Sequence, residues 1–100
     1  MHIRLSSTPE FDEWLRESDA KSRAQVDDRL DRVREYGHFG PRRYFGGELY
    51  ELKWKSGRRV YYSLVDDGSG IIVLLLLGGD KHGQKKDVAK ARKIMEREAA

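Results

Sequence analysis

The chain has 100 residues, of which 38% are hydrophobic and 37% charged, and its formal net charge at pH 7 is +3. This length and composition predict one small folded domain over residues 1–100 and exclude a chain that is disordered throughout. The absence of cysteine excludes disulfides and thiolate metal sites, and the lack of a signal peptide or of a long apolar run favours a cytoplasmic protein with no membrane partner.

Residues 1–40 predict one strand followed by two helices. A short strand is expected at "MHIRLS", where apolar and polar residues alternate. A first helix is expected to begin at Pro9, because proline suits the first helical position and a serine or threonine before it can act as the cap. A second helix is expected from about residue 19 to residue 36, before a glycine, with an apolar stripe on one side and charged residues on the other.

The second half of the sequence changes to the two-residue period of β-strands. Turn-forming residues divide this half into three expected strands: residues 49–55, 58–65 and 71–77. The last of these, "IIVLLLL", does not alternate, so it is expected to be central and covered on both faces. A final helix completes the order β-α-α-β-β-β-α. The expected fold class is therefore α+β, with a helical hairpin and a C-terminal helix packed on one face of a mainly antiparallel sheet.

Positive charge is concentrated in two blocks: residues 41–62 carry six basic and two acidic side chains, and residues 78–100 carry seven basic and four acidic ones. In the first block, alternation sets four side chains on one surface of a β-hairpin: Lys53, Lys55, Arg59 and Tyr61. An anion such as RNA or DNA would relieve the crowding of these like charges. A solvated sheet face, whose lysines prevent edge pairing, explains the same residues.

The apolar strand leads through "GGDKH" into the last helix. A strand that ends here would bring Lys81 over the surface that carries Arg59, although a plain strand-to-helix turn with Asp80 near the cap is the simpler alternative. There is no P-loop, metal-ligand spacing or nucleophile motif, and no cofactor is expected. The remaining side chains suit phosphodiester chemistry without a metal, because arginine and lysine can stabilise a phosphorane-like transition state and lysine, tyrosine or histidine can move protons.

Four segments carry a resemblance to a known family: "GHFG" at 37–40, "GGELYELKW" at 46–54, "GRRVYY" at 57–62 and "LLLLGGDKHGQKKDVAKA" at 74–91. With "TPEFDEWLRE" near the N-terminus, they resemble the HigB-like addiction-module killer proteins of the RelE/ParE toxin superfamily over nearly the whole chain. The resemblance implies the RelE/ParE-like fold and a cytoplasmic toxin of a type II toxin–antitoxin system. RelE-like members are metal-independent endoribonucleases (mRNA interferases) that stop translation and growth, commonly on the ribosome, whereas ParE-like members poison DNA gyrase and cleave no RNA.

The same resemblance implies roles for individual residues. Arg59 would stabilise the scissile phosphate, Lys81 would act on that phosphate or donate a proton, and Lys53 would activate the ribose 2′-OH. Tyr61 would orient the nucleotide. Three further residues are expected to bind substrate: Lys55, Arg58 and His82. His82 departs from the family pattern, in which a small hydroxyl residue is more usual.

The resemblance also implies partners. The toxin is expected to bind mRNA and the ribosome, and to form a heterotetramer with a cognate antitoxin, usually a helix-turn-helix DNA-binding protein, while the toxin alone is monomeric. An antitoxin that covers the basic face and one that packs on the helical hairpin are both compatible with the sequence. A third interpretation is an inactive chain that only holds its antitoxin, and the joint presence of Arg59, Lys81 and Lys53 argues against it.

Overall fold

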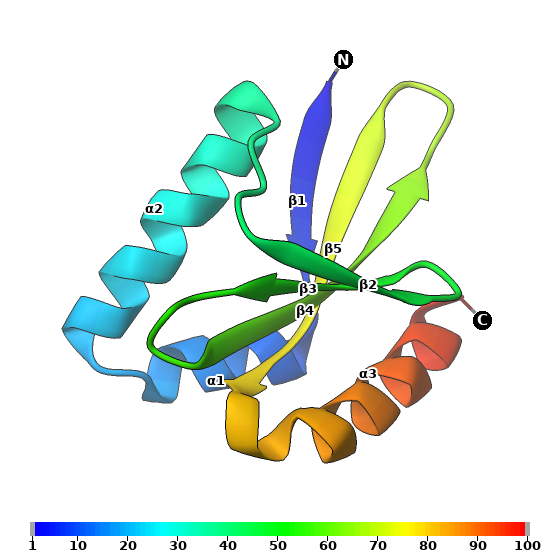
Figure 1. Ribbon diagram of the computed structural model, residues 1–100. Coiled ribbons are helices and arrows are strands. Elements are labelled where there is room, and N and C mark those ends of the chain that lie inside the picture. Colours follow the sequence, from blue (N-terminus) through cyan, green and yellow to red (C-terminus); the bar gives the residue numbers. More distant parts are fainter. Residues whose placement is uncertain (1, 100) are drawn as a thin grey trace.

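The computed structural model describes residues 2–99, so Met1, at the start of the first expected strand, and Ala100 lie outside it (Figure 1). Its elements follow in this order: β1 (Ile3–Ser7), α1 (Pro9–Glu17), α2 (Ala20–Tyr36), β2 (Arg42–Gly46), β3 (Leu49–Lys53), β4 (Arg58–Asp66), β5 (Ile71–Asp80), a 3-10 turn η1 (Lys81–Gly83) and α3 (Gln84–Ala99). The expected α+β class, with a helical hairpin and a C-terminal helix on a mainly antiparallel sheet, is confirmed. None of the helices within residues 2–99 is long and apolar enough to cross a membrane.

The five strands form one sheet in the order β1-β5-β4-β3-β2. β1 pairs in parallel with β5, with Ile3 opposite Ile71, and all other neighbouring strands are antiparallel. β5 lies inside the sheet, with α1 packed on one of its faces and α3 on the other (Figure 1). The expectation that this apolar run is covered on both faces is therefore confirmed.

The sheet differs from the sequence prediction in two respects. Four strands follow the second helix instead of three, because β2 is an additional edge strand that pairs only with β3. Its first three residues are exposed and its register shifts after Tyr44, so it shows no regular alternation of buried and exposed residues. The helices also do not share one face of the sheet, since α1 and α2 cover one face and α3 covers the other. Periodicity gives each helix an apolar side but does not say which face of the sheet that side meets.

The two N-terminal helices begin at capping side chains, and the sequence predicts the cap of the first. The Thr8 hydroxyl accepts the N–H of Phe11 at 3.2 Å and caps α1. The same hydroxyl donates to the carbonyl of Leu76 at 2.7 Å, which fixes the start of α1 on β5. Asp19 caps α2 in the same way, and a glycine with a φ of +68° ends that helix.

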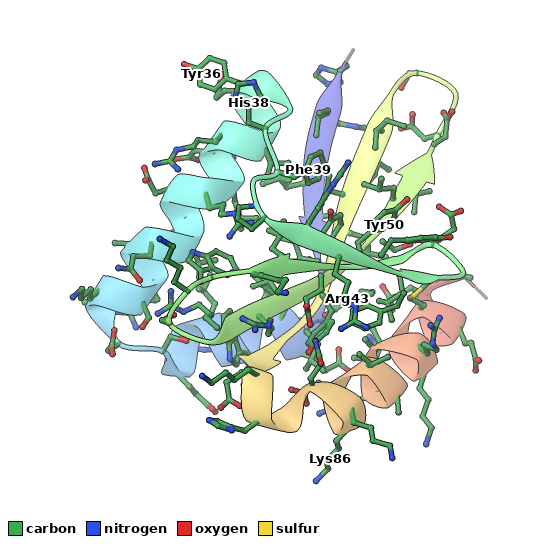
Figure 2. The ribbon with its side chains drawn as sticks, in the orientation of Figure 1. Tyr36, His38, Phe39, Arg43, Tyr50 and Lys86 are labelled. Atoms are coloured by element: carbon green, nitrogen blue, oxygen red, sulfur yellow. The ribbon has the colours of Figure 1, made fainter. Side chains whose placement is uncertain are left out.

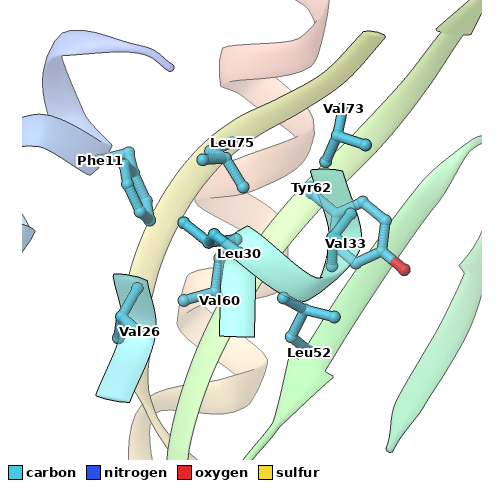
Figure 3. Close-up of a cluster of buried hydrophobic side chains, with 9 residues drawn as sticks. All are labelled: Phe11, Val26, Leu30, Val33, Leu52, Val60, Tyr62, Val73 and Leu75. Carbon is cyan, nitrogen blue, oxygen red and sulfur yellow. The ribbon is translucent and has the colours of Figure 1, made fainter. Parts of the chain in front are cut away.

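An apolar core lies on each face of the sheet. The core under α1 and α2 contains nine buried side chains, shown in Figure 3: Phe11, Val26, Leu30, Val33, Leu52, Val60, Tyr62, Val73 and Leu75. The core under α3 contains Leu49, Tyr61, Leu76, Leu77, Ala91 and Ile94. A bulge in β5 supplies both cores: Tyr61 pairs with Leu77 and Tyr62 with Leu75, so Leu76 is an extra residue that joins Leu77 under α3.

Aromatic rings hold the additional strand β2 on the sheet. Phe39 and Tyr50, labelled in Figure 2, each stack on Tyr62, with ring centroids 5.5 and 5.2 Å away. Tyr44 of β2 lies 4.7 Å from Tyr50, and the guanidinium of Arg42 lies 4.7 Å above the Phe39 ring. Ring stacking, rather than an alternating apolar pattern, therefore anchors this edge.

Candidate functional site

The end of β5 has no side chains at Gly78 and Gly79, and neighbouring helices occupy the space that these side chains would need. A Cβ at Gly78 would lie 1.9 Å from the Trp14 ring of α1. A Cβ at Gly79 would lie 2.2 Å from the Asp87 carboxylate of α3. The two glycines therefore allow one helix to approach the strand closely on each face, and they fix where the chain leaves the sheet.

Three of the expected catalytic residues lie around the end of the β3–β4 hairpin. Lys53 on β3, Arg59 on β4 and Gly79 on β5 stand directly opposite one another. Lys81 follows the last residue of β5, and its N–H donates to the Gly57 carbonyl in the hairpin turn at 2.8 Å. The Lys81 side chain passes over that turn, with its carbons 3.4 Å from the position of a Cβ on Gly57. The expectation that the exit of the apolar strand brings Lys81 to the hairpin of Arg59 agrees with this arrangement.

The guanidinium of Arg59 is held by the protein on two sides. Its Nη1 donates to the carbonyl oxygens of Trp54 at 3.1 Å and of Arg58 at 2.9 Å. Its Nε lies 3.7 Å from Oε1 of Glu51, and the side chain is only 12% exposed. Its Nη2 makes no hydrogen bond to any residue between 2 and 99. Nε also has no hydrogen-bond partner among these residues, but it is buried, so Nη2 is the nitrogen that remains for an external anion.

The surface expected to be open and basic is largely covered by α3. Glu51 and Tyr61, which stand opposite each other on β3 and β4, are both fully buried. Glu51 accepts a hydrogen bond from Nε2 of Gln84, the first residue of α3, at 2.8 Å. Burial, and then the neighbouring Glu51 carboxylate, raise the pKa of Tyr61 well above its usual range. Tyr61 is thus part of the core beneath α3 rather than of an open surface, because the strand alternation that exposes one face cannot reveal the helix that covers it.

The three expected substrate-binding residues lie in different places. Arg58 is on the opposite face from Arg59 and donates to the side chains of Gln25 and Ser22 on α2, at 2.9 and 2.8 Å. Lys55 is exposed in the hairpin turn. His82 is exposed in η1, where its backbone N–H donates to the Asp80 carboxylate at 2.8 Å. Asp80 is accordingly the capping residue of that turn.

Residues 13–98 match the family described as phage-derived protein Gp49-like (DUF891). The chain belongs to the Gp49-like family. An uncharacterized protein of Haemophilus influenzae is 33% identical to this Gp49-like chain over 95 residues, which cover 92% of each sequence.

Solved structures with the same fold are bacterial toxins. A mutant of the E. coli toxin RelE in the free state matches the Gp49-like protein with a TM-score of 0.72 and 20% identity, over 97% of this chain and 98% of that one. The toxin–antitoxin complex RelBE of E. coli matches with a TM-score of 0.64 and 22% identity, over 77% and 94%. A YoeB/ParE toxin from Agrobacterium tumefaciens matches with a TM-score of 0.59 and 14% identity, over 77% and 97%. The RelE/ParE-like fold expected from the sequence is thereby confirmed.

A buried arginine of the Gp49-like protein was not anticipated from the sequence as part of the site. Arg29 on α2 is 8% exposed, and it donates to the carbonyl oxygens of Phe39, Pro41 and Lys53. Its guanidinium also lies 4.4 Å above the Trp54 ring, and burial lowers its pKa. Arg29 lies in the inward stripe of α2, between Val26 and Leu30, and this position in the sequence indicates that its side chain is buried.

Beside this arginine, the Gp49-like protein has an open groove of about 570 Å³ between α2 and the end of β3. Besides Arg29, its lining includes four basic residues: Arg32, His38, Lys53 and Lys55. Because Lys53 lines this groove and also stands opposite Arg59, the groove leads to the hairpin end where the expected catalytic residues meet.

Proposed function

We propose that this chain is a HigB-like toxin of a type II toxin–antitoxin module, and that it acts as a metal-independent endoribonuclease on mRNA at the ribosome, inhibiting translation and growth. The observation that carries this proposal is the state of Arg59. The protein holds its guanidinium on two sides and leaves Nη2 to an external anion, at a hairpin end that also receives Lys53 and Lys81. The RelE-like fold adds support, although a fold alone does not determine an activity.

In the proposed reaction, the ribose 2′-oxygen attacks the adjacent phosphorus. The new 2′-O–P bond forms as the P–O5′ bond breaks, which leaves a 2′,3′-cyclic phosphate and a 5′-hydroxyl. Lys53 acts as the general base that takes the 2′-OH proton, and Lys81 acts as the general acid that gives a proton to the departing 5′-oxygen. Arg59 stabilises the charge that develops on the phosphate oxygens. Arg59 and Lys81 thus supply the positive charge that stabilises the transition state.

The other expected site residues have supporting roles in this proposal. Lys55 and His82, both exposed beside the hairpin end, bind flanking parts of the RNA. Arg58 fixes the hairpin to α2 through its two hydrogen bonds. Tyr61 does not contact the nucleotide, because its side chain is fully buried beneath α3. Its role is to support the hairpin from within the core.

Expression of the chain without an antitoxin tests the proposed function. We expect growth arrest and mRNA cuts at codon-related positions, detected by primer extension, and we expect Arg59→Ala or Lys81→Ala to relieve both while circular dichroism shows an intact fold. Lys93→Ala, an exposed lysine on α3, is the matched control and should remain toxic. Growth arrest with intact mRNA and a DNA-damage response would instead support a gyrase poison.

We also propose that the chain binds a cognate antitoxin that is a helix-turn-helix DNA-binding protein. The similarity in fold to the toxin in the RelBE toxin–antitoxin complex supports this proposal. Co-expression with the product of an adjacent gene, followed by light scattering of the purified complex, would measure its stoichiometry. Two toxins with two antitoxins is the expected assembly, and a toxin that remains free would contradict it.

A further inference from the structure

A fully buried carboxylate lies directly behind Arg59. Glu51 is 0% exposed, and the proposed reaction gives it no role. One of its oxygens, Oε2, accepts from Gln84 Nε2 at 2.8 Å, while Oε1 faces Nε of Arg59 at 3.7 Å. Because it has no access to solvent, Glu51 cannot contact a substrate, so any effect on chemistry must pass through a neighbour.

Burial of an ionised carboxylate is unfavourable unless nearby donors compensate for the lost water. A glutamine or an apolar residue could fill the same space without a charge. A carboxylate at this position is therefore either a tolerated part of the core or a group that orients the adjacent guanidinium of Arg59. The location of its two partners favours the second interpretation.

The two partners of Glu51 belong to the two parts of the candidate site. Arg59 belongs to the β3–β4 hairpin, which also carries Lys53. Gln84 begins α3 immediately after η1, the turn that starts with Lys81. The carboxylate therefore connects the hairpin, on which the phosphate would bind, to the segment that carries the expected proton donor.

We propose that Glu51 is a positioning residue: its carboxylate orients the Arg59 guanidinium through Nε and fixes the first turn of α3, and hence Lys81, through Gln84. The inference rests on the proposed ribonuclease activity. Turn carbonyls hold Nη1 and Glu51 faces Nε, so the guanidinium plane is set before RNA binds and Nη2 is left without a partner among residues 2–99. Preorganisation of this kind lowers the barrier of a reaction without tighter binding of the substrate.

Glu51→Gln is the first test, because the new amide has one acceptor and one donor group where the carboxylate has two acceptors. Its one oxygen can accept from Gln84 or face Nε of Arg59 but cannot do both, and the negative charge that faces Arg59 is lost. In single-turnover cleavage of mRNA on purified ribosomes, we expect the rate to fall by up to about 100-fold, the loss that a misplacement of about 1 Å can produce. Affinity for mRNA with a 2′-deoxy nucleotide at the scissile position should not weaken, because removal of a negative charge beside Arg59 cannot repel phosphate.

A double variant that moves the carboxylate from position 51 to position 84 tests whether the hydrogen-bond geometry causes the loss of rate. In Glu51→Gln with Gln84→Glu, the amide on β3 can accept from Arg59 and donate to the new carboxylate on α3. We expect this pair to recover a large part of the rate that the single variant loses. Glu13→Gln, an exposed glutamate on α1, is the matched control for the loss of one carboxylate and should cleave as the wild type does.

An NMR measurement decides the structural part of the inference without reference to activity. In ¹⁵N-labelled protein, the Nε–H signal of Arg59, assigned with Arg59→Lys, should exchange slowly with water and should shift and exchange faster in Glu51→Gln. If the protein cleaves no RNA but the Arg59 signal still changes in Glu51→Gln, the ribonuclease proposal is wrong, while the conclusion that Glu51 orients Arg59 stands.

The opposite results would overturn the inference. An unchanged Arg59 signal in Glu51→Gln means that the carboxylate does not orient the guanidinium. A lower melting temperature with an unchanged rate per folded molecule means that Glu51 is only part of the core. A variant that loses RNA affinity and rate in equal proportion would assign Glu51 to substrate binding, which its burial does not allow.

Discussion

Two arginines at the end of β3, Arg29 and Arg59, have different roles because their hydrogen bonds differ. All the hydrogen bonds of Arg29 go to backbone carbonyls around it, which join α2 to the loop before β2 and to the end of β3. Arg59 gives only part of its donors to the protein. An arginine whose donors are satisfied internally is a structural crosslink, whereas one with a free nitrogen at the surface can bind an anion.

The crosslinking role of Arg29 leads to a prediction about stability. Arg29→Met keeps an apolar side chain of similar length in place but removes the guanidinium donor of the Phe39 and Lys53 carbonyls, while the Pro41 carbonyl keeps the N–H of Lys53. We expect the free energy of unfolding to fall by at least about 2 kcal/mol, since each buried polar group left unpaired is unfavourable. Urea denaturation of the purified protein measures this difference.

Arg32→Met, one turn away on the exposed side of α2, is the control for that measurement. Arg32 forms a surface ion pair with Asp28 on the same helix, so its loss should change the free energy of unfolding by less than about 0.5 kcal/mol. Equal destabilisation by the two substitutions would show that the carbonyl contacts of Arg29 contribute nothing.

At the scale of elements, the end of β5 depends on the absence of two side chains. The clash at Gly78 would be with the Trp14 ring, which is itself packed against Phe11 with centroids 5.7 Å apart. The clash at Gly79 would be with the tip of the Asp87 side chain, which can rotate away. The two glycines are therefore unequal, although they are adjacent in the sequence.

This difference predicts that Gly78→Ala destabilises the protein more than Gly79→Ala does. The first substitution must displace α1 from the sheet, and we expect a loss of about 1–3 kcal/mol in the free energy of unfolding. Trp14→Leu should relieve part of that loss when combined with Gly78→Ala, so that the two changes are not additive. Additive effects, measured by thermal or urea unfolding, would contradict the close approach of α1 to β5.

The elements also show what can be predicted from the sequence. The start of α1 and the apolar run of β5 carry local signals, a capping threonine before Pro9 and an unbroken series of branched residues, and both are confirmed. β2 carries no such signal, because its Tyr44 and Arg42 are held by the rings of Tyr50 and Phe39, which lie in other segments. The burial of Glu51 and Tyr61 depends on the face that α3 covers, which is a property of the assembled sheet.

At the scale of the whole molecule, the small net charge of +3 conceals an uneven distribution. The hairpin end and the adjacent groove collect Lys53, Lys55 and Arg32, while Lys81 approaches from the end of β5. Net charge alone would therefore underestimate the attraction of this region for an anionic polymer.

The clustering predicts a steep dependence of RNA binding on salt. If Lys55, Arg59 and Lys81 each neutralise one phosphate of single-stranded RNA, the logarithm of the binding constant should fall with the logarithm of salt concentration with a slope of about −2. Lys55→Gln should reduce the magnitude of that slope by about 0.7. Fluorescence anisotropy with a labelled, uncleavable oligonucleotide gives both values, and a flat response would show that these side chains do not bind phosphate.

The parallel pairing of β1 with β5 has a consequence for the synthesis of this protein. β1 emerges from the ribosome first, but the strand that it pairs with is made after two helices and three other strands. The sheet therefore closes only after β5 has been made, and Lys81, which follows β5, reaches the hairpin at the same stage. A nascent chain that has not yet reached Lys81 cannot assemble this hairpin end, so an activity located there must await the synthesis of β5 and of the lysine that follows it.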